Sequence, residues 1–324
     1  MIKRIVGTLV GLAGVGAGVL AASFVVLGNR RIDEWETLTI DDAVEGDYVE
    51  LDDGTRLHYI TCGDPANEPI ILIHGLMDSA LHWHKNIAAL AEHHRVFAID
   101  LPGFGYSSRV NEPVYCLDYL ARAVHDFMNE REIWRADIAG HSLGGAVALQ
   151  MAHDYPERVD KLVLIAPGTY LTNQLEPLKY AARVPYAPRA IMGFAMTSEQ
   201  ARIRSWQHAL GSPEHLDRNE LSLRVRPQRV KGTADALIAM AASCWTNNLA
   251  NELDRVTAPT LILWGDRDRT VPPWHGDRHI NALPKAELIV LEGAGHIPQN
   301  EFPERVNELM LGFLTNQTQG LSTA

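Results

Sequence analysis

In the stretch Gly140-His141-Ser142-Leu143-Gly144, one serine stands between two glycines, and one residue separates it from each. The strand-like run 136–139 comes directly before, and the run 145–151 after it has the composition of a helix. A strand that turns sharply into a helix strains the backbone at its apex, and a side chain at either flanking position would clash there. The stretch therefore predicts a strand–turn–helix unit that exposes the serine hydroxyl. Because such a short pattern also arises by chance, other residues must support it.

Ser142 needs a base, and the base needs an orienting carboxylate, because an alkyl hydroxyl is a poor nucleophile near neutral pH. Two downstream loops offer these groups, each after a buried-strand run. The loop 264–272 carries Asp266 and Asp268, and the later loop ends in His296. Loops at the carboxyl ends of parallel strands gather at one edge of an open α/β sheet, so we expect both beside the serine.

Three further motifs accompany the serine stretch in a fixed order. They are His74-Gly75 after an apolar run, the segment Asp100-Leu101-Pro102-Gly103-Phe104-Gly105-Tyr106-Ser107, and Gly295-His296 followed by Glu301 and Pro303. Together the four motifs resemble the α/β-hydrolase superfamily, and the resemblance covers residues 48–314. It implies a doubly wound, mostly parallel sheet with a helical lid inserted into it.

The resemblance also implies a role for each candidate residue. Ser142 becomes the nucleophile, and His296 acts first as general base and then as general acid. In the family pattern the acid lies three residues before a Val-Pro pair, which selects Asp268 to orient the imidazole. Asp266 is then a residue that caps its loop or forms a salt bridge beside Arg267 and Arg269.

Attack on an acyl carbon places negative charge on the carbonyl oxygen, which backbone N–H groups stabilise. The residue after the nucleophile supplies one N–H, that of Leu143, and the residue after His74-Gly75 supplies the other, that of Leu76. Met77 is the alternative to Leu76. We expect His74 to hold this loop through its ring hydrogen bonds, and His141 to support the serine turn. The loop departs from the Gly-rich form, which argues against bulky alcohols in the substrate.

The composition limits the partners. With 324 residues, of which 46% are hydrophobic and 21% charged, the chain can bury one large α/β core. Its formal net charge of −11 does not suit nucleic acid, because phosphate contacts require clustered Lys and Arg. Three scattered cysteines predict no disulfide framework. The acidic and histidine pairs lack metal-ligand spacing, so no metal and no cofactor are expected.

The N-terminus carries an uncharged apolar segment, Ile5 to Leu27. At about 1.5 Å per residue it is long enough to cross a bilayer, so it predicts an uncleaved transmembrane helix. A signal peptide cleaved near Ala21-Ala22-Ser23 is the alternative. Glycine pairs at 7 and 11 and at 14 and 18 have the spacing of a helix dimer, so a homodimer is a weaker expectation. Basic residues flank both ends of the segment and do not choose a membrane side.

The rest of the chain divides by pattern. We expect an anchor at 1–31, a tether at 32–47, a catalytic body formed by 48–167 and 257–314, a lid at 168–256, and a disordered tail at 315–324. The predicted strands are 48–51, 57–61, 70–73, 96–99, 137–139, 162–165, 260–263 and 287–291. The clearest helices are 117–130 and 145–153, and a last helix near Pro303 runs through Phe313.

These features predict a membrane-anchored serine hydrolase of carboxylic esters with apolar acyl chains, resembling lipases of the monoacylglycerol type or carboxylesterases. Epoxide hydrolases and haloalkane dehalogenases carry Asp where this chain has Ser142. Hydrolases of carbon–carbon bonds typically show Asn before the serine and Trp after the histidine, where this chain has His141 and Ile297. They remain an alternative, as do cofactor-free perhydrolases and a non-catalytic binding protein of the same fold.

Overall fold

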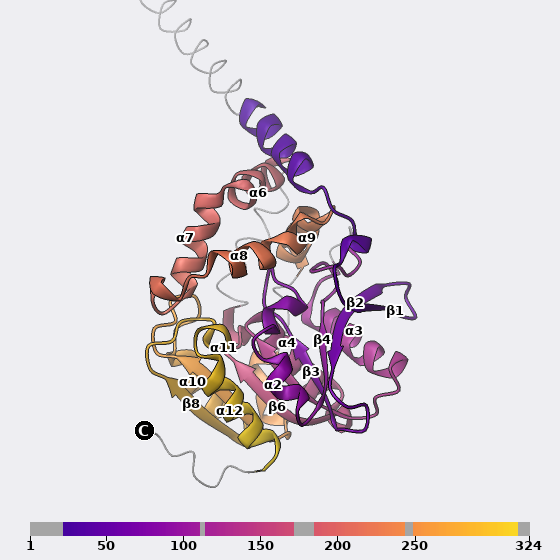
Figure 1. Cartoon of the computed structure of the whole chain (residues 1–324), viewed down its shortest axis with the longest axis vertical. Helices are drawn as coiled ribbons and strands as arrows, with labels where there is room; N and C mark the ends of the chain where they lie inside the picture. The colour runs from indigo at the N-terminus through magenta and orange to yellow at the C-terminus, as the bar shows by residue number, and fades with distance from the viewer. Residues whose placement is uncertain (1–21, 111–113, 172–184, 244–248, 317–324) are drawn as a thin grey trace, which may run out of the picture.

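The computed structural model describes residues 22–110, 114–171, 185–243 and 249–316. Its centre is an eight-stranded sheet with the order β1-β2-β4-β3-β5-β6-β7-β8 (Figure 1). The strands are β1 Asp47–Glu50, β2 Arg56–Cys62, β3 Pro69–Ile73, β4 Arg95–Ile99, β5 Ala136–His141, β6 Val159–Ile165, β7 Thr260–Gly265 and β8 Ala286–Leu291. The pairings of β1 with β2 and of β2 with β4 are antiparallel, and all others are parallel. The predicted mostly parallel sheet is therefore confirmed.

Each face of the sheet is covered by helices. Alternate strand residues point to opposite faces, so Ile71 and Leu72 of β3 enter different hydrophobic clusters. The Leu72 cluster includes residues of α2 and α12, and the Ile71 cluster includes residues of α3 and α4. These helices are α2 Ile87–Ala91, α12 Pro303–Leu314, α3 Leu117–Glu130 and α4 Leu143–Asp154. The two layers of helices bury both faces of the sheet, and the loops at its carboxyl edge lie between them and the lid.

A helical insertion separates β6 from β7, within the predicted lid at 168–256. We use "lid" for its described residues 185–243. Its helices are α6 Ala187–Thr197, α7 Glu199–Ala209, α8 Arg218–Val225 and α9 Thr233–Ser243. The other short helices of the described chain are η1 Ile40–Asp42, η2 Ala80–Trp83, η3 Pro156–Arg158, η4 Thr169–Leu171, η5 Pro213–His215, η6 Arg226–Arg229, η7 Leu249–Asn251, η8 Leu253–Arg255, α10 Trp274–Ala282 and α11 Pro298–Glu301.

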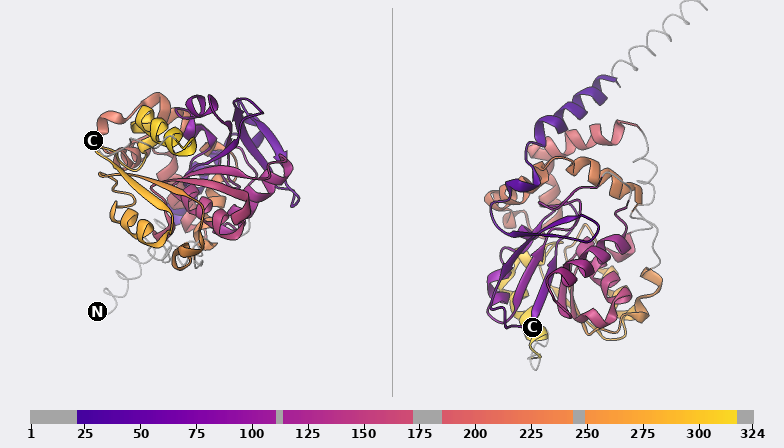
Figure 2. Two further views of the ribbon diagram at one scale, coloured as in Figure 1. Left: turned by 90° about the horizontal axis from the view of Figure 1, so that it is seen from below. Right: turned by 90° about the vertical axis from the view of Figure 1, so that its right-hand side faces the viewer.

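The described chain begins with a helix, residues 22–35, that crosses the lid helix α6 (Figure 2, right). A Cβ atom added to Gly28 would collide with the α6 backbone, and one added to Gly193 would collide with the carbonyl oxygen of Gly28. The two helices therefore touch backbone to backbone. Beside the crossing, the rings of Phe24 and Phe194 stack with centroids 4.8 Å apart.

The stretch 32–47, predicted as a tether, contacts the lid as well. Ile32 is fully buried. The buried carboxylate of Glu36 accepts hydrogen bonds from the backbone N–H groups of Gly232, at 2.9 Å, and Ala234, at 2.7 Å, where α9 begins. Burial raises the pKa of Glu36 above its ordinary value against the effect of these bonds. The first part of this stretch is thus packed into the folded body.

The predicted membrane segment Ile5 to Leu27 lies outside the described residues up to position 21, and so do its glycine pairs. Within the part of the chain that the structure describes, no helix combines the length and the apolar character needed to span a bilayer. The predicted tail lies outside the described residues from position 317.

Candidate active site

Ser142 occupies the sharp turn between β5 and α4, as the sequence predicts. Its backbone angles are φ 51° and ψ −113°, a conformation that L-residues rarely adopt. A Cβ atom added to Gly140 would collide with the carbonyl oxygen of Gly144, and one added to Gly144 would collide with that of Ile73. Both flanking positions therefore require glycine, and the strained turn leaves the serine partly exposed.

Three side chains from distant parts of the sequence form a continuous hydrogen-bonded chain. His296 Nε2 lies 3.0 Å from Ser142 Oγ, and His296 Nδ1 donates to Asp268 Oδ2 at 2.7 Å. Because Nδ1 carries the proton, Nε2 is free to accept one from the serine hydroxyl. The other carboxylate oxygen, Asp268 Oδ1, accepts from the N–H groups of Thr270, at 2.8 Å, and Val271, at 2.9 Å. Asp268 is thereby fixed on one side by its own loop and faces the imidazole on the other.

The rival carboxylate, Asp266, lies in the same loop but contacts a different partner. Its Oδ1 accepts from the N–H of Gly293 at 2.7 Å, which braces the loop that leads to His296. Glu301 holds the same loop from the other side, since its Oε1 accepts from the N–H of Gly295 at 2.8 Å. Its Oε2 accepts from the N–H of Gly211 in the lid at 2.7 Å. Of the two carboxylates, Asp268 contacts the His296 ring and Asp266 does not, and the catalytic role of Asp268 stays a prediction.

The loop after β3, residues 75–79, is held by His74. The His74 ring donates from Nδ1 to the carbonyl oxygen of Gly75 at 2.7 Å and accepts at Nε2 from the N–H of Leu101 at 3.1 Å. The Asp100 motif completes this support, because buried Asp100 accepts from the N–H of Ala80 at 2.5 Å. The role expected of the His74 ring is confirmed.

The same loop passes directly beside the serine. A Cβ atom added to Gly75 would lie 3.3 Å from Ser142 Cβ. Within the described ranges, the N–H groups of Leu76 and Leu143 donate to no protein acceptor. Both groups are therefore free to bind an oxyanion formed at Ser142. Their assignment as the oxyanion hole stays a prediction.

A family model described as the alpha/beta hydrolase fold matches residues 68–303. The chain belongs to the α/β-hydrolase fold family. This α/β-hydrolase is 31% identical over 306 residues to a 2-hydroxy-6-oxononadienedioate/2-hydroxy-6-oxononatrienedioate hydrolase of Paraburkholderia phymatum, covering 86% of the chain and 99% of the relative. It is 32% identical over 265 residues to the dihydrolipoyllysine-residue acetyltransferase component of the acetoin cleaving system of Pseudomonas putida, covering 81% and 67%.

A solved structure, described as a membrane phospholipase A and novel bacterial virulence factor, is similar over almost the whole of both chains. It covers 98% of this α/β-hydrolase and 100% of its own chain, with 25% identity and a TM-score of 0.70. The family and the names of the relatives support hydrolase activity for this chain.

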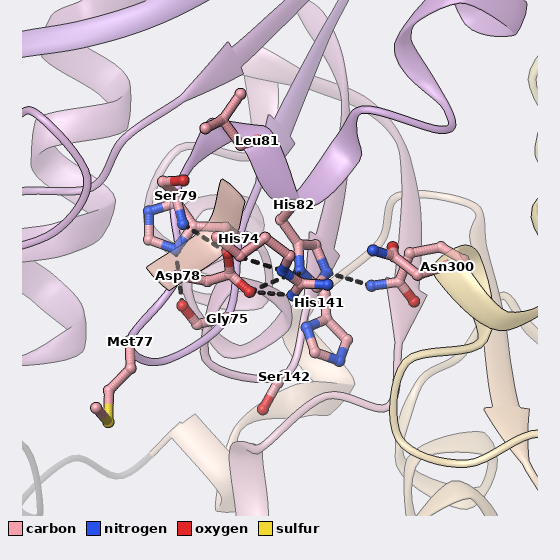
Figure 3. A network of polar contacts seen from close by, with 12 residues as sticks. His74, Gly75, Met77, Asp78, Ser79, Leu81, His82, His141, Ser142 and Asn300 are labelled. Atoms are coloured by element: carbon pink, nitrogen blue, oxygen red, sulfur yellow. Dashed lines mark hydrogen bonds and ion pairs between the residues drawn. The ribbon is translucent and has the colours of Figure 1, made fainter. Parts of the chain in front are cut away.

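His141 of this α/β-hydrolase supports the histidine loop rather than exchanging protons with it. Its Nε2 donates to the carbonyl oxygen of His296 at 2.7 Å, and its ring stacks on that of His82 at 4.6 Å (Figure 3). Burial, with the neighbouring His82 and His296, lowers the pKa of His141 well below its ordinary value. His141 therefore stays neutral and does not compete with His296 as a base.

A buried polar network beside the site was not predicted from the sequence. Asp78 belongs to the loop 75–79, which we call the oxyanion loop, and it accepts from His82 Nδ1 at 2.9 Å (Figure 3). Asp78 also pairs with Arg224 of the lid. Burial opposes the charge of Asp78, but Arg224 and His82 outweigh it and lower its pKa. Burial and the Arg224 charge lower the pKa of His82 to about 4. No local spacing could have revealed this network, because Asp78 and Arg224 are 146 positions apart.

Proposed function

We propose that this α/β-hydrolase is a serine esterase that cleaves carboxylic esters with apolar acyl chains. The observation that carries the proposal is the hydrogen-bonded chain from Ser142 through His296 to Asp268. A serine whose proton can pass to a carboxylate-oriented imidazole is activated for attack on an acyl carbon.

The reaction would proceed in two halves. Ser142 Oγ attacks the acyl carbon while His296 Nε2 takes the hydroxyl proton, and the N–H groups of Leu76 and Leu143 bind the resulting oxyanion. When the tetrahedral intermediate collapses, His296 returns the proton to the leaving alcohol and the acyl group stays on Ser142. A water molecule, deprotonated by His296, then releases the carboxylic acid and restores the serine.

We further propose that the enzyme works at a bilayer, held there by the segment Ile5 to Leu27. A tethered enzyme meets lipid-derived esters at a high local concentration. The likeness to a membrane phospholipase A over almost the whole chain supports this placement. So do the exposed apolar side chains at the start of the described helix, where Phe24, Val26 and Leu27 are 43%, 68% and 52% exposed.

A second candidate is hydrolysis of a carbon–carbon bond. It is favoured by the 31% identity to a 2-hydroxy-6-oxononadienedioate hydrolase. Against it stand His141 and Ile297, at positions where such hydrolases typically have Asn and Trp.

One substrate panel tests both candidates with the purified full chain. It contains p-nitrophenyl esters of short and long acyl chains, phospholipid vesicles and a 2-hydroxy-6-oxodienoate, each assayed with the parent and with Ser142→Ala. We expect ester turnover that rises with acyl length and disappears in the variant. Turnover of the dienoate without ester cleavage would establish the second candidate. No turnover, together with no labelling by a fluorophosphonate, would refute both and leave a binding protein.

A further inference from the structure

A buried arginine of the lid contacts the oxyanion loop. Arg224 belongs to α8, and its side chain is 2% exposed. Its Nε donates to Asp78 Oδ1 at 3.3 Å, and its Nη2 donates to Asp78 Oδ2 (Figure 3 shows Asp78 and the dashed contacts around it). Two parallel bonds from one guanidinium to one carboxylate fix the direction as well as the distance between the partners. Asp78 therefore cannot shift without disturbing α8.

The lid holds the loop at a second point. Gln228 of η6 donates from Nε2 to the carbonyl oxygen of Met77 at 2.8 Å. Met77 has φ 61°, a left-handed conformation that a residue with a side chain adopts at a cost in free energy. The two residues that directly follow Leu76 are thus both bound to the lid, one through its carboxylate and one through its carbonyl group.

Arg224 is itself held in place from several sides. Its guanidinium lies 4.1 Å from the centre of the Trp206 ring in α7, and its Nη1 lies 3.4 Å from Glu220 Oε1 in α8. Glu220 is in turn bound by Asn300 Nδ2 at 2.8 Å and by Lys85 Nζ at 2.8 Å, both outside the lid. The guanidinium is therefore a fixed point between lid and catalytic body.

We infer that Arg224 is a positioning residue for the oxyanion hole: through Asp78 it sets the direction in which the Leu76 N–H points. The inference rests on the proposed function, since it assigns that N–H to the oxyanion. An N–H group that binds an oxyanion must be held within about 0.5 Å of its productive position. The loop gains this placement from the lid, so the hole is complete only while the lid is seated.

The test removes the charge pair without leaving a buried charge unpaired, which would destabilise the fold. The main variant is the double substitution Asp78→Asn with Arg224→Gln, and Arg224→Lys keeps the charge but not the two parallel bonds. Arg218→Gln is the matched control, because Arg218 lies in the same helix, is exposed and does not touch the loop. Amide hydrogen exchange of residues 75–79, and kcat and KM for p-nitrophenyl butyrate, are measured on the full chain.

We expect faster exchange in the loop and a kcat lower on the order of 10²-fold in the double variant, as for loss of one oxyanion donor, with KM close to that of the parent. Arg224→Lys should lie between the double variant and the parent, and Arg218→Gln should match the parent. Unchanged loop exchange, or faster exchange with unchanged kcat, would overturn the inference. If the double variant loses exchange protection throughout the fold, the same two outcomes are judged on Arg224→Lys instead. If the parent itself cleaves no ester, the proposed function fails, while loop exchange still decides whether Arg224 holds the loop.

Discussion

Replacing Ser142 by glycine should stabilise the fold relative to replacing it by alanine. Both substitutions remove Oγ and its hydrogen bond to His296, so they differ only in the Cβ atom. Alanine keeps the strain of φ 51° and ψ −113°, which amounts to about 1–3 kcal/mol for such conformations. Glycine relieves the strain but loses roughly 0.5–1 kcal/mol through its freedom in the unfolded chain. From the middle of each range, the free energy of unfolding of the glycine variant should be higher than that of the alanine variant by about 1 kcal/mol.

Urea denaturation of the two variants under identical conditions measures this difference directly. The control is Ala146→Gly in α4, a buried position in regular helix, where glycine should destabilise by about 1 kcal/mol. If glycine is more stabilising than alanine at position 142 but less stabilising than alanine at position 146, the backbone is strained at the serine turn. A Ser142→Ala variant as stable as Ser142→Gly, or more stable, would refute the reasoning.

Three further tests, two of them with a matched control substitution, address other parts of the structure. Asp268→Asn should lower kcat for ester hydrolysis by about 10³–10⁴-fold, because an amide does not orient the imidazole correctly. Asp266→Asn should leave kcat nearly unchanged. Similar losses of kcat in the two variants would contradict the assignment. Burial, followed by the charge of Asp160, raises the pKa of Asp137 to about 7. Between about pH 4 and 7 the unfolded chain therefore gives up this proton while the folded protein keeps it, so the parent should lose stability as the pH rises. Asp137→Asn should not show this loss. The advantage of the variant should reach up to about 4 kcal/mol in denaturation at pH 8 and be smaller at pH 5, and a gap that does not widen with pH would exclude this effect. Glu36→Ala leaves two buried N–H groups at the start of α9 without an acceptor, so it should lower the free energy of unfolding by about 2 kcal/mol and speed amide exchange in residues 22–38. The control Glu34→Ala removes an exposed carboxylate and should change neither quantity. Equal effects of the two substitutions would argue against the cap.

The sheet could be predicted because its signals are local. Each parallel strand is a short apolar run between loops, and each predicted strand overlaps an observed one, as 70–73 does with β3. The predicted helix 117–130 has the bounds of α3. The sequence could predict that Ser142, Asp268 and His296 lie close together, because each follows a strand and parallel strands end at one edge of the sheet.

The lid contacts could not be predicted in this way. The pairing of Arg224 with Asp78 depends on how α8 lies over the sheet, which no periodicity in either segment specifies. The stretch 32–47 was predicted as a tether because it is acidic and lacks a strand period, yet its acidic residue Glu36 caps α9. A charge run does not distinguish a solvated linker from a carboxylate that satisfies buried N–H groups.

The crossing of the first described helix with α6 affects how the protein should be shortened for study. A chain begun after residue 31 would lose residues 22–31 of this helix, including Gly28, whose backbone touches Gly193 of α6. The surface of α6 that packs against this backbone would then be exposed to solvent or to a neighbouring molecule. Rate constants from such a shortened chain would then describe an altered lid, so the protein is better studied with residues 22–31 in place.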